Sequence, residues 1–330
     1  MPDLHASSPI YYHPYTLRFR AGKSANAASP IGEARGALLR IGDGFACLQP
    51  WPTLGDPTLA KCLSDLQGKR RWPLVRRALR CAEYDAHARQ HEESLFEEME
   101  IPPSHFTCAG LDRQAIDWAV ELGHETIKLK CGRDLNAEAL FLREASAALP
   151  KLRWRLDFNE VPKREEVRGF ILALPEPVRD QIDFLEDPCP FHADSWETLK
   201  RETGADLALD REAAPNGSTS KSAAYLVLKP ALDEPWLLAE AASRQGQRVI
   251  VTSYMDHPLG QAFAAWEAGR LALQFPNHVG TCGLQTHHLF EPNAFTEALG
   301  DPGPTFQPTG WTGLGFDELL DELPWKELPA

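Results

Sequence analysis

Short apolar runs alternate with amphipathic stretches along most of the chain after residue 100. Each run spans four to seven residues, as a buried strand does, and the stretches between them span about 12 to 18, as surface helices do. The runs lie at residues 104–108, 126–130, 154–158, 182–185, 206–209, 225–228, 249–253 and, least clearly, 278–282. Eight such units in succession favour an α/β barrel. An open doubly wound sheet is disfavoured, because residues 108–110 are too poor in glycine for the phosphate turn that normally follows its first strand.

The first hundred residues follow a different pattern. Two strand-like pieces, 15–20 and 37–41, precede a region between residues 57 and 99 in which apolar positions recur at helical spacing. This order predicts a small α+β unit over residues 1–99, followed by the barrel over 100–300. The tail, residues 301–330, is rich in proline and glycine, and we expect it to fold back onto the N-terminal unit.

Composition places the chain among ordinary globular proteins. It has 330 residues, 43% of them hydrophobic and 25% charged, and no apolar run approaches the roughly 18 residues that a membrane helix needs. The net charge of −13, without a compensating basic cluster, disfavours nucleic acid as a partner. No basic segment followed by an apolar one opens the chain, so we expect a cytoplasmic protein. The seven cysteines form no CxxC pair and are expected to be reduced.

Three acidic residues lie at or just after the ends of three successive apolar runs. They are Asp157, Glu186 and Asp210, separated by 29 and 24 residues, each about one strand and helix. Strand ends meet at one face of a barrel, where barrel enzymes have their active sites, so we expect the three carboxylates to converge. A hard divalent cation relieves the repulsion between converging carboxylates. A single strand-end acid is more often a helix cap or a solvated residue, so the predicted Mg²⁺ site depends on all three together.

Lysines flank these acids on either side along the chain. Strand alternation puts Lys128 and Lys130 on one face of the run 126–130, and Lys229 ends the run 225–228, where it would face Lys130 across the barrel mouth. A free lysine is protonated at neutral pH, so a lysine base requires its pKa to fall by roughly three units. Neighbouring positive charge and burial both act in that direction, which is a use for a Lys-x-Lys spacing.

The same residues carry a family resemblance that spans nearly the whole chain. Residues 128–130, 157–159, 186–188, 210 and 229–230 resemble the muconate-lactonizing-like branch of the enolase superfamily. Within that branch the chain is most similar to the o-succinylbenzoate synthases, through residues 155–159, 253–260 and 283–286 and through Pro50-Trp51-Pro52. The resemblance implies an α/β fold: a modified TIM barrel, (β/α)7β, with an α+β capping domain built from the N-terminus and the C-terminal tail.

The resemblance also implies a chemistry. The enzyme would be a hydro-lyase of menaquinone biosynthesis, which carries out the syn-dehydration of 2-succinyl-6-hydroxy-2,4-cyclohexadiene-1-carboxylate to o-succinylbenzoate with Mg²⁺, or Mn²⁺ as a substitute. Lys130 would remove the α-proton and then help hydroxide to leave, while Lys229 would stabilise the enediolate and Lys128 would disfavour charge on Lys130. The implied substrate contacts are Arg155, Asn159, Ser253 and Gly283, and residues 22–29 correspond to a mobile capping-domain loop.

Several alternatives stay open. Arg211 separates Asp210 from Glu212, so either acid could be the third metal ligand, and we favour Asp210. A lysine on each face also suits an N-succinylamino acid racemase or a dipeptide epimerase on the same scaffold. A rival of another class is a non-catalytic barrel that binds carboxylate ligands. A small carboxylate is the expected partner, and the sequence leaves the oligomeric state open.

Two histidine pairs are expected to be structural or peripheral. His87 and His91 have the i, i+4 spacing of a zinc pair, but no glutamate follows the first histidine and further acids surround them, which favours a solvated helix face. His287 and His288 are neighbours that point in different directions, so at most one could enter the site.

Overall fold

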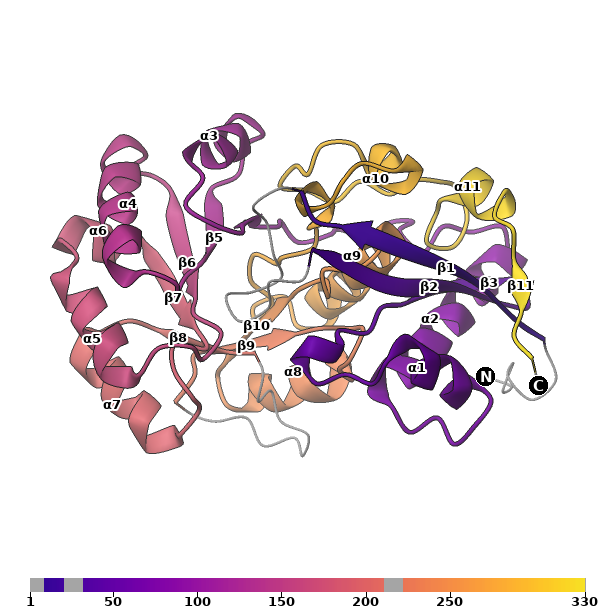
Figure 1. Cartoon of the computed structure of the whole chain (residues 1–330), viewed down its shortest axis with the longest axis horizontal. Coiled ribbons are helices and arrows are strands. Elements are labelled where there is room, and N and C mark those ends of the chain that lie inside the picture. The colour runs from indigo at the N-terminus through magenta and orange to yellow at the C-terminus, as the bar shows by residue number, and fades with distance from the viewer. Residues whose placement is uncertain (1–8, 21–31, 211–221, 330) are drawn as a thin grey trace.

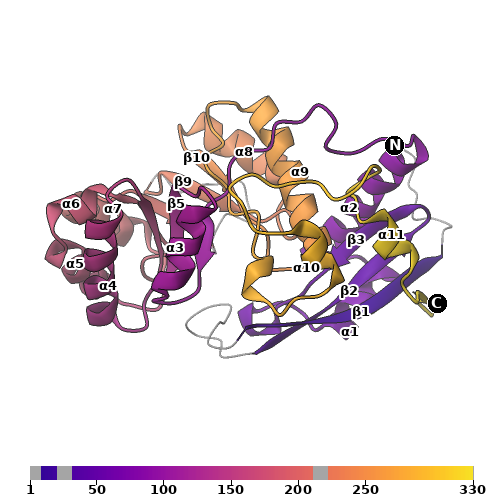
Figure 2. The same ribbon diagram turned by 90° about the horizontal axis from the view of Figure 1, so that it is seen from above.

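The computed structural model describes residues 9–20, 32–210 and 222–329, which form two sheets (Figures 1 and 2). A four-stranded sheet has the order β11-β1-β2-β3, and a seven-stranded sheet runs β10-β9-β8-β7-β6-β5-β4. The first is antiparallel and the second parallel. The predicted fold, a barrel with a capping domain made from both chain ends, is confirmed, and residues 1–99, 100–300 and 301–330 stay proposed domain boundaries.

The capping domain is an antiparallel sheet covered by helices. Its strands are β1 (Ile10–Arg18), β2 (Glu33–Ile41), β3 (Gly44–Leu48) and β11 (Lys326–Glu327), and its helices are α1 (Leu59–Leu66) and α2 (Pro73–Gln90). The tail strand β11 pairs with β1, as the yellow and indigo ribbons show in Figure 1. The region expected to be helical consists of these two helices, and the second begins at Pro73, whose missing N–H is tolerated at the first position of a helix.

Close packing of α2 on β3 depends on a glycine. A Cβ at Gly44 would collide with the backbone of Ala82 and with Ala86, so no larger residue allows the helix and the strand to approach this closely. Both strands of the β2–β3 hairpin are largely buried under this helix.

The barrel strands follow the predicted runs closely. They are β4 (Phe106–Cys108), β5 (Thr126–Lys130), β6 (Arg153–Asp157), β7 (Ile182–Glu186), β8 (Leu207–Leu209), β9 (Tyr225–Leu228) and β10 (Arg248–Val251). Each pairs in parallel with its neighbour in sequence, and nearly all of their residues are buried, as in sheets covered on both faces.

Helices connect these strands and cover the outside of the sheet (Figure 2). They are α3 (Arg113–Glu121), α4 (Leu135–Ala148), α5 (Arg164–Ala173), α6 (Glu176–Asp180), α7 (Ala193–Thr203), α8 (Pro235–Arg244) and α9 (Pro258–Gln274). After the barrel come α10 (Ala294–Leu299) and α11 (Asp317–Asp321). No helix in the described part of the chain combines the length and apolar composition needed to cross a bilayer.

The eighth predicted run makes isolated bridges instead of a full strand. Val279 bridges to Val249 of β10, and Gly283 bridges to Thr252, just after β10. Cys282 bridges to Ser104, just before β4. These parallel bridges connect the two edges of the seven-stranded sheet. The barrel is thus closed by a segment too irregular to form a continuous ladder, which explains its weak signal in the sequence.

A buried arginine joins the capping domain to the barrel. Arg77 of α2 is 4% exposed; its Nε donates to Pro230 O at 2.8 Å and its Nη2 to Glu267 Oε1 of α9 at 2.7 Å. A third donor, Nη1, reaches Glu234 Oε2 at 3.1 Å. The guanidinium therefore holds the loop after β9 and the helix α9 to the same capping helix.

Asp256 is a second buried acidic residue at this interface. Asp256, between β10 and α9, is 2% exposed, and its Oδ1 has no hydrogen-bond partner among the described residues. Burial raises the pKa of Asp256 to about 7. Its neighbour Gly260 has no Cβ, which leaves room for this carboxyl group.

We expect Asp256→Asn to stabilise the protein at alkaline pH. An unfolded aspartate has a pKa of about 3.9, so between that pH and about 7 the folded chain keeps a proton that the unfolded chain loses, and stability falls as the pH rises. The upper limit of this loss is about 4 kcal/mol, from about three pKa units at 1.36 kcal/mol each. Urea unfolding at pH 5 and pH 8 should show a larger stability advantage of the variant over the parent at the higher pH.

The matched control is Asp301→Asn, at an exposed position, which should change stability little at either pH. A D256N protein that is no more stable than the parent at pH 8 would contradict the raised pKa.

Candidate functional site

Three predicted site residues end neighbouring strands at one level. In the sheet register Lys130 of β5 is the partner of Asp157 of β6, and Asp157 is the partner of Glu186 of β7. Asp210 directly follows β8, and Lys229 directly follows β9. The parallel register therefore gathers acids and lysines from five successive strands at the carboxyl end of the sheet.

Each of the three acids contacts a lysine ammonium group. Lys128 Nζ lies 2.8 Å from Asp157 Oδ2 and 2.5 Å from Glu186 Oε1. Lys130 Nζ lies 2.6 Å from the same Asp157 Oδ2, and Lys229 Nζ donates to Asp210 Oδ1. The lysines of β5 thus share one carboxylate, as alternation along the strand predicts.

The charges of the cluster shift its pKa values in opposite directions. Burial and the Asp157 charge raise the pKa of Glu186 to about 7, whereas Lys128 and Lys130 outweigh the effect of burial and lower the pKa of Asp157. Burial acts to lower the pKa values of Lys128 and Lys229, but the carboxylates that they contact raise both overall. At these two lysines the lowering expected from neighbouring positive charge is outweighed by the acids between them.

The chemistry of the donor set fits a divalent metal. A cation, the Lys128 ammonium group, already lies where the carboxylates of Asp157 and Glu186 converge, and hard oxygen donors of this kind suit Mg²⁺. Among the described residues no three His, Cys, Asp or Glu side chains are grouped to hold a metal as they stand. The acid oxygens are instead directed at lysines, so the residues fit the ion by type while their present contacts are with ammonium groups.

The loops that carry these acids have unusual backbone conformations. Asn159, Glu160 and Asp187 adopt left-handed φ values of 50°, 60° and 40°. Asn159 donates through its N and Nδ2 to Asp157 Oδ1, at 3.2 and 2.5 Å, and Asp187 Oδ1 accepts from the N–H of Asp210 at 3.0 Å. Non-glycine residues in this region cluster at functional sites, and here the hydrogen bonds orient two of the three acids.

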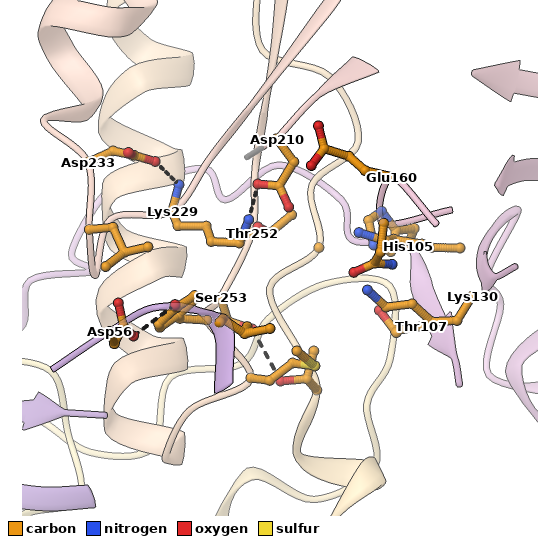
Figure 3. Close-up of a pocket in the computed structure, with 18 residues that line it drawn as sticks. Asp56, His105, Thr107, Lys130, Glu160, Asp210, Lys229, Asp233, Thr252 and Ser253 are labelled. Atoms are coloured by element: carbon orange, nitrogen blue, oxygen red, sulfur yellow. Dashed lines mark hydrogen bonds and ion pairs between the residues drawn. The ribbon is translucent and has the colours of Figure 1, made fainter. Parts of the chain in front are cut away.

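A pocket of about 410 Å³ opens above the strand ends (Figure 3). Lys229, Asp210 and Asp233 lie on one side of it and Lys130 on the other, with Ser253 and Asp56 at a third edge. Asp56 belongs to the capping domain; its Oδ2 accepts from Tyr254 Oη at 2.9 Å. Both domains therefore contribute to the wall of the pocket.

Three of the four predicted substrate contacts line the pocket. Asn159, Ser253 and Gly283 do so, and Ser253 Oγ lies 3.2 Å from Thr286 Oγ1. Arg155 is not among the lining residues and is only 3% exposed, because its guanidinium group is bound deeper in the barrel. Direct contact between Arg155 and a substrate stays a prediction. Residues 22–29 and Glu212 lie outside the described residues.

Several lining residues were not predicted from the sequence. His105, just before β4, and Thr107 of β4 face inward, and Asp233 accepts from the N–H of Lys229 at 2.6 Å. Alternation along residues 104–108 could have found the first two, since Phe106 between them packs outward on Trp118 of α3. Nothing in the local pattern distinguishes Asp233 from an ordinary turn aspartate.

Neither histidine pair lines the pocket. His87 and His91 stack on each other, with ring centres 4.5 Å apart, at the exposed C-terminal end of α2. His287 is hydrogen-bonded to Gln261 and to Gly300 O, while His288 stacks on Phe106. These contacts are those of structural residues.

Comparison with known proteins identifies the family of the chain. The family model "O-succinylbenzoate synthase, N-terminal domain" matches residues 10–88, and "Enolase C-terminal domain-like" matches residues 110–215. The chain is similar to the o-succinylbenzoate synthase of Bdellovibrio bacteriovorus, at 33% identity over 97% of this chain and 98% of that protein.

Solved structures share the fold. The dipeptide epimerase of Enterococcus faecalis, complexed with Mg and the dipeptide L-Leu-L-Tyr, has a TM-score of 0.77 at 14% identity over 93% of this chain and 98% of its own. The muconate lactonizing enzyme of Pseudomonas fluorescens has a TM-score of 0.76 at 15% identity over 96% and 99%. The chain belongs to the o-succinylbenzoate synthase family, in the muconate-lactonizing branch of the enolase superfamily.

Proposed function

We propose that this protein is an Mg²⁺-dependent o-succinylbenzoate synthase that dehydrates 2-succinyl-6-hydroxy-2,4-cyclohexadiene-1-carboxylate in menaquinone biosynthesis. The observation that carries the proposal is the arrangement of Lys130 and Lys229 on opposite sides of one pocket with buried carboxylates between them. The similarity over the full length to a protein named for this activity supports the choice of reaction.

The proposed metal ligands are Asp157, Glu186 and Asp210. A bound Mg²⁺ would stabilise negative charge as it develops on a substrate carboxylate, which is the main barrier to removing the adjacent proton. Each of the three acids already faces a lysine ammonium group, so a bound ion would take the place of positive charge that the carboxylates now contact.

The proposed reaction uses one lysine as both base and acid. Nζ of Lys130 takes the proton α to the substrate carboxylate, and the electron pair of the broken C–H bond moves onto the carboxylate, which becomes an enediolate. That pair then returns to form the new ring double bond as the C–O bond of the hydroxyl group breaks. The same Nζ gives its proton to the departing hydroxide, which leaves as water, and the ring becomes aromatic. Lys229 keeps its proton throughout and faces the other side of the ring, where its charge stabilises the enediolate.

We expect the protein to convert the cyclohexadiene substrate to its aromatic product in the presence of Mg²⁺, because loss of water aromatises the ring. Ultraviolet absorbance follows the product directly. Solvent-deuterium incorporation into N-succinylamino acids and dipeptides, assayed in parallel, tests the racemase and epimerase alternatives. Exchange into either of these without any aromatic product would assign the protein to the rival reaction.

Lys130→Ala and Lys229→Ala should each lower kcat by roughly 10²- to 10⁴-fold, the range expected on loss of a proton-transfer group or its electrostatic partner. Steady-state kinetics with folding checked by circular dichroism makes the comparison. Lys200→Ala is the control, since Lys200 is a partly exposed lysine on α7 that pairs with Asp206 away from the pocket. A carboxylate-binding barrel without catalysis predicts unchanged binding and no turnover in any of these proteins, the parent included.

Removal of divalent ions should abolish turnover, and Mg²⁺ should restore it. Calorimetric titration with Mg²⁺ alone should detect one site in the parent, which Glu186→Gln and Asp210→Asn should weaken, because each removes a charged oxygen donor. Asp206→Asn, at the opposite end of β8 from Asp210, is the matched control and should leave the affinity unchanged. Equal Mg²⁺ affinity in all four proteins would refute the proposed ligand set.

A further inference from the structure

His105 is an inward-facing histidine at the floor of the pocket. It directly precedes β4 and is 2% exposed, and its neighbour Thr107 is the register partner of Lys128, so His105 lies one inward position deeper than that lysine. In Figure 3 it lies on the Lys130 side of the pocket.

Arg155 determines which ring nitrogen of His105 carries the proton. Nη1 of Arg155 lies 2.8 Å from Nδ1 of His105. An arginine can only donate hydrogen bonds and keeps its charge in proteins, so Nδ1 must accept, and the proton of the neutral ring is on Nε2. Burial and the charge of Arg155 lower the pKa of His105 well below the usual range, which agrees with a neutral ring.

Arg155 is itself held rigidly. Its Nε donates to Asp183 Oδ2 at 2.7 Å, its Nη1 also donates to Thr281 O at 2.6 Å, and its guanidinium group lies 4.6 Å from the centre of the Phe184 ring. An arginine fixed by an acid, a carbonyl and an aromatic ring cannot readily turn to a substrate. It can orient the histidine that does face the pocket.

The Nε2 edge of His105 is open because residue 283 is glycine. A Cβ at Gly283 would lie 2.6 Å from both Nε2 and Cε1 of the ring, so any side chain there would cover this edge. No hydrogen-bond partner of Nε2 is found within the described parts of the chain, and both residues line the pocket. The structure thus contains a buried N–H donor beside free space.

We propose that His105 is a substrate-contacting residue of this site, whose neutral Nε2–H donates a hydrogen bond to a carboxylate or carbonyl oxygen of the substrate, and that Arg155 is the positioning residue that fixes this tautomer. The proposal rests on the synthase function proposed above. It also gives Gly283 a physical role: the glycine leaves the donor uncovered.

Two substitutions of His105 distinguish the roles of its two ring nitrogens. In His105→Asn the amide oxygen can replace Nδ1 as acceptor for Arg155, but nothing reaches the Nε2 position. In His105→Gln the longer side chain can bring an amide N–H near that position. We expect H105N to lower kcat/KM by about 10- to 100-fold, mainly through a higher KM, and H105Q to recover part of the loss, because one hydrogen bond to substrate is removed and then partly restored. His278→Asn, at a histidine outside the pocket, is the matched control.

Gly283→Ala provides an independent test. Its methyl group should cover Nε2 or displace the ring, so it should raise KM as H105N does, and the double variant should lose little more than either single one. Gly303→Ala, where no atom lies within 4 Å of the added methyl group, should behave like the parent. Additive losses in the double variant would overturn the link between Gly283 and His105.

Nitrogen-15 NMR of the histidine rings tests the proposal without turnover. The resonance pair that disappears in H105N should have the pattern of an Nε2-protonated neutral ring, and its Nε2 signal should move when o-succinylbenzoate is added. An Nδ1-protonated ring would overturn the inference. So would an Nε2 signal that does not shift on addition of o-succinylbenzoate to a protein with synthase activity. A protein without synthase activity whose His105 signal still responds to o-succinylbenzoate refutes the proposed reaction alone, and one with neither property refutes both.

Discussion

Charge compensation inside the barrel is the constraint on which the site depends. Carboxylates from the ends of β6, β7 and β8 meet in a buried space where, alone, they would repel one another strongly. Lys128 and Lys130 from β5 and Lys229 from β9 supply the opposite charges at contact distance. A cluster with balanced charges tolerates burial, and its carboxylates also favour a cation, so the same charge balance that allows the residues to be buried fits the proposed metal site.

The register of the parallel sheet brings the opposite charges of this cluster side by side. Because Lys130, Asp157 and Glu186 are register partners, a shift of one residue in any of these strands would turn a charged side chain outward into the helices. Left-handed residues after the strands, such as Asn159 and Asp187, then direct polar atoms back toward the acids. Loop residues form much of the pocket wall, whereas the charged residues lie at or just after the ends of the sheet strands.

Alternation and strand spacing were sufficient to predict the barrel, the paired lysines and the three acids, because each depends on local periodicity repeated along the chain. The weak eighth run could not be placed with the same certainty, since it makes only isolated bridges. Contacts between distant segments have no local signal: the sequence does not reveal that Asp183 and Thr281 hold Arg155 away from the pocket, or that Tyr254 meets Asp56 of the other domain. His105 lay within reach of the same alternation argument, but its tautomer depends on a partner 50 residues away.

The hydrogen bonds of Arg77 limit the motion of the capping domain relative to the barrel. This guanidinium group is bonded to the loop that follows Lys229 and to a buried glutamate of α9, so rotating the capping domain away as a rigid body would strand two charges in a dry interface. Hinge opening of the two domains is therefore costly. We expect ligands to exchange through rearrangement of individual loops around a fixed domain pair, while Lys229, just after β9, keeps its position.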